Sequence, residues 1–417
     1  MLKIKYVKHS KIMKYFIIII LILFLFLINR KKTNIIIYDE STYFTTWATA
    51  IYSTRPPSIH LNKNSLRQIV KVSASGEKIR VKFSNILGKD DLEIKKVCIA
   101  DLISNNEVNV KEMKFLTFKG RNSVVIRGGE EIYSDTIFYP LKALSEVAIS
   151  IYFGSVPKKL SGHLLPLTYS YIEKGNKINK KIFSRDNRAR HWYFISAIEV
   201  SSESPKKTIV CFGDSITDGV SGTGDARNNY PDILSERLHK NKETSDIAVI
   251  NKGIDGNRLT LQGIERYERD VLDIKGVAYI MFLFGVNDIN GLNANSDIII
   301  STYKQVIQKA HERNIFIYAG TILPFALYRR KHLWNKNKEK ARQEVNSWIR
   351  KTKPEDGGFD AFFDYDLLLK DPKNETILKD VYDCGDGIHP SLEGYKKMVD
   401  AIKDLKIFTK KPNFKSY

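Results

Sequence analysis

Residues 208–219 read TIVCFGDSITDG, and this stretch decides the fold of the second half of the chain. The apolar run 208–212 is typical of a strand buried inside a parallel sheet. A glycine and an aspartate follow it, and Ser215 then stands where the chain turns from strand to helix. A small hydroxyl residue at such a turn is presented as a nucleophile at the strand end. The stretch therefore predicts an α/β fold with Ser215 as a candidate nucleophile.

A second stretch, residues 383–390, reads DCGDGIHP near the C-terminus. It places Asp386 three residues before His389, and that spacing lets the carboxylate orient the imidazole and stabilise its charged form. Serine, aspartate and histidine also follow one another along the chain in the order found in hydrolases built on α/β sheets. We therefore predict that Ser215, Asp386 and His389 form a catalytic triad.

Two further segments follow apolar, strand-like runs: GIDGN at residues 253–257 and GVND at residues 285–288. The carboxyl ends of parallel strands meet at one edge of a sheet, where ligands of open α/β folds bind. Gly256 offers a backbone N–H without a side chain to block approach, and Asn287 offers a side-chain amide. Together with the N–H of Ser215 they are expected to form a three-donor oxyanion hole.

These four blocks, GDSIT, GIDGN, GVND and DGIH, resemble those of the SGNH hydrolases, also called the GDSL lipase/esterase family. The resemblance covers about residues 205–407. Flanking text, such as GTILPF at 320–325 and NSWIR at 346–350, is similar to a bacterial subgroup of acetyl-xylan-esterase-like proteins. Ile216 stands where the family name has leucine, an apolar exchange that faces the same core. The resemblance implies the SGNH hydrolase fold, a three-layer α/β/α flavodoxin-like parallel sheet, and carboxylic ester hydrolysis.

Three polar residues beside these blocks are assigned supporting roles. Asp214 is expected to brace the nucleophile turn by accepting backbone hydrogen bonds, with a direct catalytic role as the alternative. Asp288 is expected to be structural, and Asn257 is expected to support the site. No pair of histidines or cysteines has metal-ligand spacing, so no metal is predicted. Acyl transfer through Ser215 also requires no cofactor.

The composition is that of a globular protein long enough for two domains, with 43% apolar and 11% aromatic residues in 417. The formal charge of +20 is distributed unevenly, because residues 1–32 carry eight basic side chains and no acidic one. The remaining charge is spread along the chain as scattered lysines. No nucleic-acid-binding motif is present, so nucleic acid is not an expected partner.

Residues 15–28 form an uninterrupted apolar run between basic flanks. Since no small-residue cleavage site follows the run, we expect residues 1–32 to be an uncleaved, membrane-spanning signal-anchor. A cleaved signal peptide is the alternative. The run is shorter than the ~20 residues of a usual membrane span. The excess of positive charge before the run predicts a cytoplasmic N-terminus and a body outside the cytoplasm. The expected localisation is therefore extracytoplasmic, anchored or secreted, in a bacterium.

Short alternating runs dominate residues 40–200, for example RQIVKVS at 67–73 and EVAISIYF at 146–153. Period-2 patterning with glycine-containing turns predicts an antiparallel β-sandwich domain, jelly-roll-like. Such domains often bind sugar through stacked aromatic rings. Four aromatics are candidates for stacking, although aromatic residues in strands are more often core: Trp47, Tyr133, Tyr139 and Trp192.

Strands alternate with amphipathic helices after a polar linker at 201–207, which predicts the catalytic domain over residues 207–407 and a basic tail over 408–417. Strands are expected at 208–212, 247–250, 278–284, 315–321 and 361–364. Helices are expected at 230–240, 299–313, 338–351 and 392–405.

Three functions remain open at the level of sequence. The first is a serine esterase that deacetylates polysaccharide outside the cytoplasm. The second is a lysophospholipase or short-chain lipase that acts at the membrane through the N-terminal helix. The third is a non-catalytic surface protein that binds glycan. The expected partners are an ester substrate, an acetylated polysaccharide above all, and the membrane; the oligomeric state is left open.

Overall fold

A computed structural model describes residues 43–203, 206–220, 228–328 and 334–410 of the chain. These residues all fall within one compact unit, Ser41–Tyr417. The expected signal-anchor at 1–32 lies outside the described residues, as does the end of the basic tail. Among the residues described, no helix combines the length and the apolar character needed to cross a membrane.

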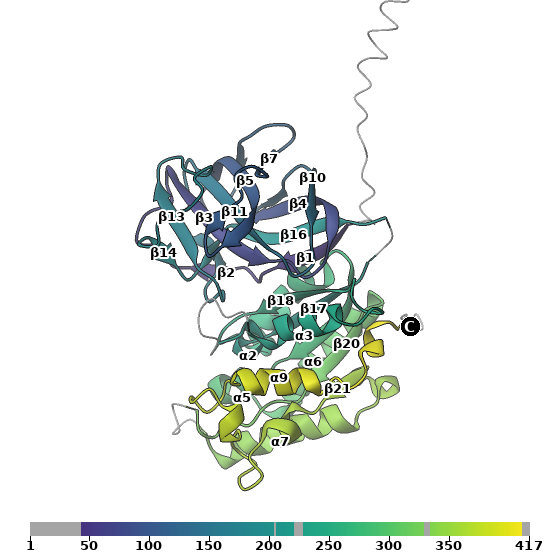
Figure 1. Cartoon of the computed structure of the whole chain (residues 1–417). Helices are drawn as coiled ribbons and strands as arrows, with labels where there is room; N and C mark the ends of the chain where they lie inside the picture. Colours follow the sequence, from purple (N-terminus) through teal and green to yellow (C-terminus); the bar gives the residue numbers. More distant parts are fainter. Residues whose placement is uncertain (1–42, 204–205, 221–227, 329–333, 411–417) are drawn as a thin grey trace, which may run out of the picture. The chain divides into compact units, whose positions relative to one another are not determined.

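The first part of this unit is built from antiparallel strands, drawn purple to teal in Figure 1. One sheet has the order β1-β16-β4-β10, with β9 beside β4, and its strands are Tyr43–Ala48, Ile195–Ser201, Gly76–Ser84, Ile137–Leu141 and Glu131–Tyr133. A second has the order β14-β13-β3-β11-β5-β6, and its strands are Arg188–Ala189, Ser170–Lys174, Asn64–Lys71, Glu146–Phe153, Leu92–Ser104 and Glu107–Val108. Strands β7 (Lys114–Leu116) and β8 (Val124–Ile126) also pair with β5, and a small third sheet joins β15 (Trp192–Tyr193), β12 (Leu160–His163) and β2 (Tyr52–Thr54).

The period-2 pattern explains how these sheets share a core. On β11, Val147, Ile149 and Ile151 point to one face and are fully buried in the same cluster as Val81 and Phe83 of β4. An antiparallel β-region before the catalytic part is therefore confirmed, whereas its jelly-roll character and its boundaries at 40 and 200 remain predictions.

Two of the four proposed stacking aromatics belong to this core instead. Trp47 and Tyr139 are buried, and the Trp47 ring meets Trp192 edge-on with 5.1 Å between ring centroids. Trp192 and Tyr133 are partly exposed, but the Trp192 indole donates to Thr168 Oγ1. The aromatic side chains of this region therefore serve packing first.

The second part is a parallel sheet of five strands, ordered β18-β17-β19-β20-β21. The strands are Ala248–Gly253, Thr208–Gly213, Val277–Leu283, Phe316–Gly320 and Ala361–Phe363. Numbered along the chain, this order is 2-1-3-4-5, that of flavodoxin-like folds. The predicted parallel sheet is confirmed, and its strands start or end within a few residues of the expected positions.

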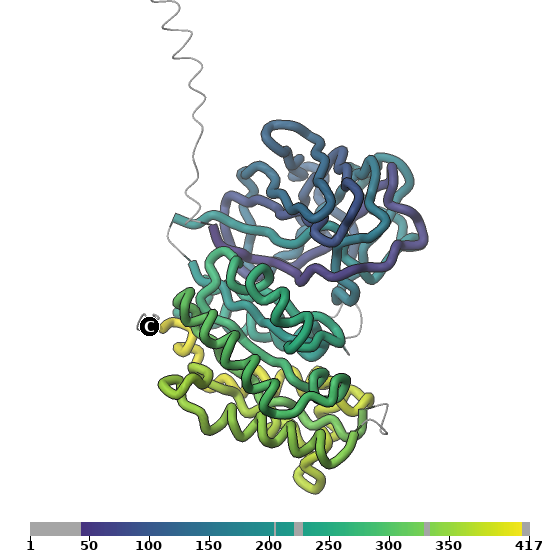
Figure 2. Tube along the Cα trace, turned by 180° about the vertical axis from the view of Figure 1, so that it is seen from behind, coloured from purple at the N-terminus to yellow at the C-terminus, as the bar shows by residue number. Residues whose placement is uncertain are grey.

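Helices cover both faces of this sheet. Right-handed crossovers place α3 (Tyr230–His239) and α9 (Leu392–Asp400), which pack together, on one face. The same rule places α4 (Ile264–Tyr267), α6 (Ser296–Glu312) and α7 (Lys336–Lys351) on the other, with α6 toward the viewer in Figure 2. The helix expected at 392–405 ends at Asp400, and a short 3-10 turn, η7 (Leu405–Phe408), follows. Phe408 is buried against the rings of Tyr279 and Tyr318, so the tail begins against the sheet.

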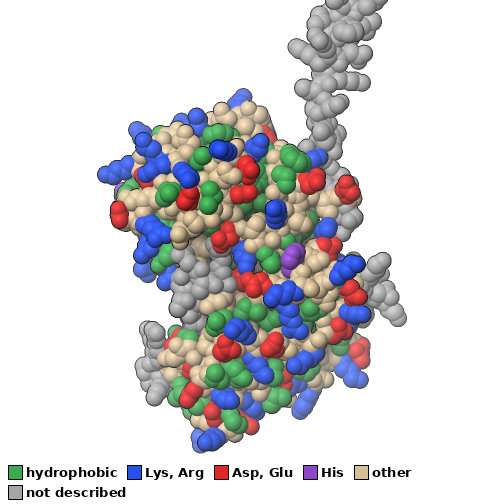
Figure 3. Space-filling view, viewed as in Figure 1, with side chains coloured by type: hydrophobic (Ala, Val, Ile, Leu, Met, Phe, Trp, Pro, Cys, Tyr) green, Lys and Arg blue, Asp and Glu red, His purple; other side chains and the backbone are tan. Residues whose placement is uncertain are grey.

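The β-region and the sheet contact each other along β1 and β18. Thr208 Oγ1 donates to the carbonyl of Thr45, and the Lys252 ammonium donates to the carbonyl of Thr49 at 2.8 Å. On the face drawn in Figure 3, Lys and Arg side chains are interspersed with Asp and Glu and form no single basic stripe.

Candidate active site

Ser215 lies at the topological switch point of the sheet, where strand order reverses and α/β folds bind ligands. Strand β17 ends at Gly213, and Ser215 begins the short helix α2, Ser215–Asp218. Asp214 caps this helix, because its Oδ1 accepts the N–H of Ile216 at 3.1 Å. A Cβ on Gly213 would lie 2.0 Å from Thr217 Oγ1 and 2.7 Å from the carbonyl oxygen of Leu283, so the turn requires glycine there.

The segment from Asp383 to Pro390 is folded into a tight loop by its own hydrogen bonds. Asp383 Oδ1 accepts the N–H groups of Gly385, Asp386 and Gly387, and the Cys384 N–H donates to the carbonyl of His389. This arrangement directs the side chains of Asp386 and His389 toward one another.

The three predicted triad residues form a continuous chain of contacts. His389 Nδ1 lies 2.6 Å from Asp386 Oδ2, and His389 Nε2 lies 2.8 Å from Ser215 Oγ. Asp386 Oδ1 also accepts the N–H groups of Ile388 and His389. Ser215 and His389 are 3% and 6% exposed, so both reacting side chains are largely buried.

The charge of Asp386 fixes the tautomer of His389. Partial burial alone would raise the pKa of Asp386, but hydrogen bonds from the His389 ring and backbone and the imidazole charge hold that pKa well below its usual range. An ionised carboxylate accepts, so His389 Nδ1 donates to it. Nε2 is then free to accept the Ser215 proton, the arrangement required of a general base.

Two of the predicted oxyanion donors belong to segments that contact each other. Residues 254–257 form a turn closed by the Asn257 N–H and the carbonyl of Ile254, and Gly256 has φ +69° in it. A positive φ at the third residue is the requirement of a type II turn, hence glycine. The Asn287 amide lies 3.2 Å from the carbonyl of Asn257. The joint action of Ser215 N–H, Gly256 N–H and Asn287 as an oxyanion hole stays a prediction.

The supporting residues hold these segments through buried hydrogen bonds. Asp288, fully buried, accepts the N–H groups of Leu259 and Thr260 and the Thr260 hydroxyl. Asn257 Oδ1 accepts from Arg266 Nε at 2.9 Å. Asp288 and Asn257 are thus placed where a structural role requires them.

Arg266 is a site residue that sequence reasoning missed. Its guanidinium donates to the carbonyl of Gly213 at 3.0 Å and to that of Lys252 at 2.8 Å, which ties the ends of β17 and β18 together two residues before Ser215 and four before Gly256. It is buried, and its guanidinium carbon lies 4.4 Å from the centroid of the Phe212 ring, inside the ~6 Å range of a cation–π contact. A single arginine among polar helix residues carries no sequence signal of this kind.

Asp214 differs from the other carboxylates of the site. It is 1% exposed, and its Oδ2 has no hydrogen-bond partner among the described residues. Burial raises the pKa of Asp214 to about 7, an effect that the Ile216 N–H and the His389 charge only partly oppose. The bracing role expected for Asp214 therefore rests on one of its two oxygens.

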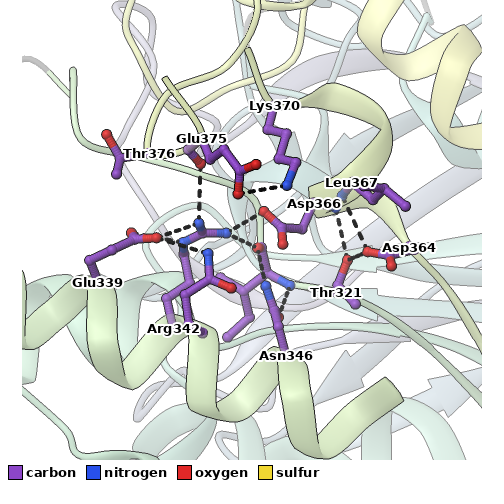
Figure 4. A network of polar contacts seen from close by, with 12 residues as sticks. Thr321, Glu339, Arg342, Asn346, Asp364, Asp366, Leu367, Lys370, Glu375 and Thr376 are labelled. Atoms are coloured by element: carbon purple, nitrogen blue, oxygen red, sulfur yellow. Dashed lines mark hydrogen bonds and ion pairs between the residues drawn. The ribbon is translucent and has the colours of Figure 1, made fainter. Parts of the chain in front are cut away.

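A polar network around Arg342 of α7 holds the segment that begins at Ile322 and contacts the loop of residues 383–390 (Figure 4). Arg342, fully buried, donates to Asp366 Oδ1 and to the carbonyl of Ile322, and Arg350 donates to Asp366 Oδ2. The segment that starts at Ile322 reaches Leu327, whose carbonyl lies against Gly387.

Ligand atoms of Asp383, Cys384 and Asp386 lie within 4.8 Å of one another, in the part of the chain that the structure describes. The carboxylate oxygens of Asp386 are occupied by His389 and by backbone N–H groups, and Asp383 Oδ1 accepts three more. The cluster is therefore explained by the hydrogen bonding of the catalytic loop.

Comparison with known proteins identifies the second part of the chain. Residues 209–402 match the sequence model of the GDSL-like lipase/acylhydrolase family. These residues belong to that family. The match spans Ser215, Asp386 and His389, and the chain is accordingly a carboxylic ester hydrolase of the GDSL type.

Solved structures of similar proteins align with about half of the chain. A GDSL-like lipase from Bacteroides thetaiotaomicron is 22% identical and covers 47% of this chain and 86% of its own, with a TM-score of 0.38. A member of the lipolytic protein G-D-S-L family from Veillonella parvula is 20% identical and covers 49% and 99%, with a TM-score of 0.37. An acetyl xylan esterase is 24% identical and covers 47% and 98%, with a TM-score of 0.37. No curated protein sequence matches the chain.

Proposed function

We propose that this GDSL acylhydrolase is a serine esterase that removes acetyl groups from polysaccharide outside the cytoplasm. The observation that carries the esterase part is the position of His389, within hydrogen-bond distance of both Ser215 Oγ and Asp386 Oδ2. A nucleophile, a base and a residue that orients the base are the parts that acyl transfer needs.

In the proposed mechanism, His389 Nε2 removes the Ser215 proton as Oγ attacks the ester carbonyl. The negative charge on the carbonyl oxygen is stabilised by the N–H groups of Ser215 and Gly256 and by the Asn287 amide. His389 then protonates the departing alcohol. A water molecule, deprotonated by His389, attacks the acyl-enzyme and releases the acid with Ser215 restored.

The near-complete burial of Ser215 and His389 supports a small acyl group, since little of either side chain is open to a long chain. The polysaccharide part of the proposal rests on the flanking text shared with the acetyl-xylan-esterase-like subgroup and on the β-region that precedes the enzyme. The extracytoplasmic location rests on the apolar run at 15–28 and its basic flanks.

The same apolar run favours the second candidate, a lysophospholipase or short-chain lipase held at its substrate by the membrane. Acetate release from acetylated xylan, compared with fatty acid release from lysolipids, separates the two. We expect acetate release by the purified protein and none by Ser215→Ala. Faster hydrolysis of lysolipids and long-chain esters would replace the first candidate by the second, and a folded protein inactive on every ester would favour glycan binding alone.

A further inference from the structure

A second histidine–aspartate pair lies beside the active site, and its histidine comes from the β-region. His163, at the end of β12, places Nε2 2.8 Å from Oδ1 of Asp218, the last residue of the nucleophile helix α2. The side chains of both residues are 5% exposed. Neither residue belongs to the triad, and the strand that carries His163 is far from α2 along the chain.

The contacts of His163 define its protonation. Its Nδ1 lies 3.0 Å from the carbonyl of Ala50, which only accepts, so Nδ1 donates. With Nδ1 protonated, Nε2 can face a carboxylate favourably only if it donates as well. Burial and the charge of Arg266 lower the pKa of His163, but the Asp218 carboxylate, with help from the Ala50 carbonyl, raises it above its ordinary value. The pair is therefore an imidazolium bound to a carboxylate.

The other oxygen of Asp218 contacts the turn of residues 254–257, called the oxyanion turn below because it carries the predicted donor Gly256. Asp218 Oδ2 accepts the N–H of Asp255 at 3.0 Å, and Asp255 directly precedes Gly256 in the turn of residues 254–257. A Cβ on Gly253 would lie 2.2 Å from the backbone nitrogen of Asp218, so α2 and this turn approach as closely as backbone allows. Asp218 thus connects the helix of the nucleophile with the turn that carries a proposed oxyanion donor.

We propose that His163 is a positioning residue of the active site, which holds the Asp218 carboxylate against the Asp255 N–H and so orients the Gly256 N–H toward the developing oxyanion. The inference rests on the proposed esterase function, and it gives the β-region a part in catalysis. His163 acts only through Asp218: both of its ring nitrogens are already engaged, so it cannot serve as a base.

The test compares kcat and KM on p-nitrophenyl acetate for the wild-type chain, His163→Ala, His163→Gln and Asp218→Asn. Removal of an outer partner that orients a metal ligand typically costs about 10–100-fold, and we take the same scale for this oriented backbone donor. We expect His163→Ala to lower kcat by that factor with KM changed less than about twofold. Glutamine keeps a donor for Asp218, so His163→Gln should recover part of the loss. The double variant His163→Ala/Asp218→Asn should be no slower than the slower single variant.

A matched control removes another contact between the same two parts of the chain. Lys71 of β3 lines the same pocket as His163 but pairs with Glu236 of α3 at 2.8 Å rather than with a residue of α2, so Lys71→Met should leave kcat unchanged. Imidazole provides a second readout, because His163 and Asp218 line a pocket of about 70 Å³ beside the position that His163→Ala vacates. Added imidazole should raise kcat of His163→Ala, with Ser215→Ala measured alongside to subtract hydrolysis by imidazole itself.

Unchanged kcat in folded His163→Ala and His163→Gln would overturn the proposal. So would failure of both variants to fold, which would make the pair a contact that only holds the fold, or equal losses in His163→Ala and Lys71→Met. A wild-type protein inactive on every ester would contradict the esterase function instead, so the two failures are distinguishable.

Discussion

At the scale of single residues, Asn287 is the donor whose role is most open to measurement. Its amide lies 3.2 Å from the carbonyl of Asn257, which fixes its position beside the oxyanion turn before substrate arrives. If the amide stabilises charge that develops only in the transition state, Asn287→Ala should lower kcat by about 10²–10³ with little change in KM. A variant with a lower melting temperature but normal kcat would leave Asn287 as a structural turn residue.

The raised pKa of Asp214 predicts how the free energy of unfolding depends on pH. The carboxyl titrates near pH 3.9 when unfolded and near 7 when folded. Between those values the folded protein binds the additional proton, so the free energy of unfolding falls as the pH rises from about 4 to 7. Asp214→Asn keeps an acceptor for the Ile216 N–H and removes the titrating group.

Urea unfolding of wild type and Asp214→Asn between pH 4.5 and 8 measures this effect. We expect the stability of Asp214→Asn relative to wild type to increase with pH and then level off above about 7. Asp386 does not disturb this measurement, because its pKa is lowered on folding and its contribution to the free energy of unfolding is present above about pH 3.9. That contribution is lost only as the pH falls toward the pKa of Asp386 in the folded protein. Parallel curves for the two proteins would refute the raised pKa of Asp214.

At the scale of elements, the catalytic loop offers a matched pair of glycines. Gly385 has φ +99° and Gly387 has φ +82°, a conformation that costs an alanine ~1–2 kcal/mol. A Cβ on Gly385 meets nothing within 4 Å, whereas a Cβ on Gly387 would lie 2.3 Å from the carbonyl carbon of Leu327. Gly387→Ala must therefore displace the loop or the segment above it.

We expect both alanine variants to lose a similar amount of stability, because both positions have a positive φ. Only Gly387→Ala should lose most of its kcat, because that displacement moves Asp386 and His389. Thermal unfolding and kcat, measured for both, test this difference. Equal kcat values in the two folded variants would show that the contact with Leu327 does not position the loop.

Some elements and contacts of the site could be predicted from the sequence, and others could not. Apolar strands followed by polar turns predicted the parallel sheet, and Asp386 at i−3 of His389 predicted a contact within one loop. Arg266 and His163 were not predicted, because their partners are backbone carbonyls and a carboxylate brought near only by the tertiary fold. The helical segment 259–272 was missed too, since its π turns, η2 (Leu259–Gly263) and η3 (Glu268–Leu272), depart from the 3.6-residue period.

At the scale of the whole molecule, the N-terminal sequence predicts where the enzyme acts. With residues 1–32 as a signal-anchor, protease added to intact cells or spheroplasts should degrade the chain beyond residue 33, and the protein should fractionate with membranes. A soluble, shortened form that starts near residue 33 would indicate cleavage instead. Protection from protease, with the chain recovered from the cytoplasm, would contradict the extracytoplasmic location.

The central claim is that Ser215, activated by His389, is the nucleophile of an acyl-enzyme mechanism. An alkyl p-nitrophenyl phosphonate tests it directly, since attack by a serine oxygen releases nitrophenol and leaves a stable phosphonate ester. Intact mass and peptide mapping should show one adduct per chain on Ser215, formed far more slowly in His389→Ala and absent in Ser215→Ala. An adduct on another residue, or an unmodified and still inhibited enzyme, would contradict the account.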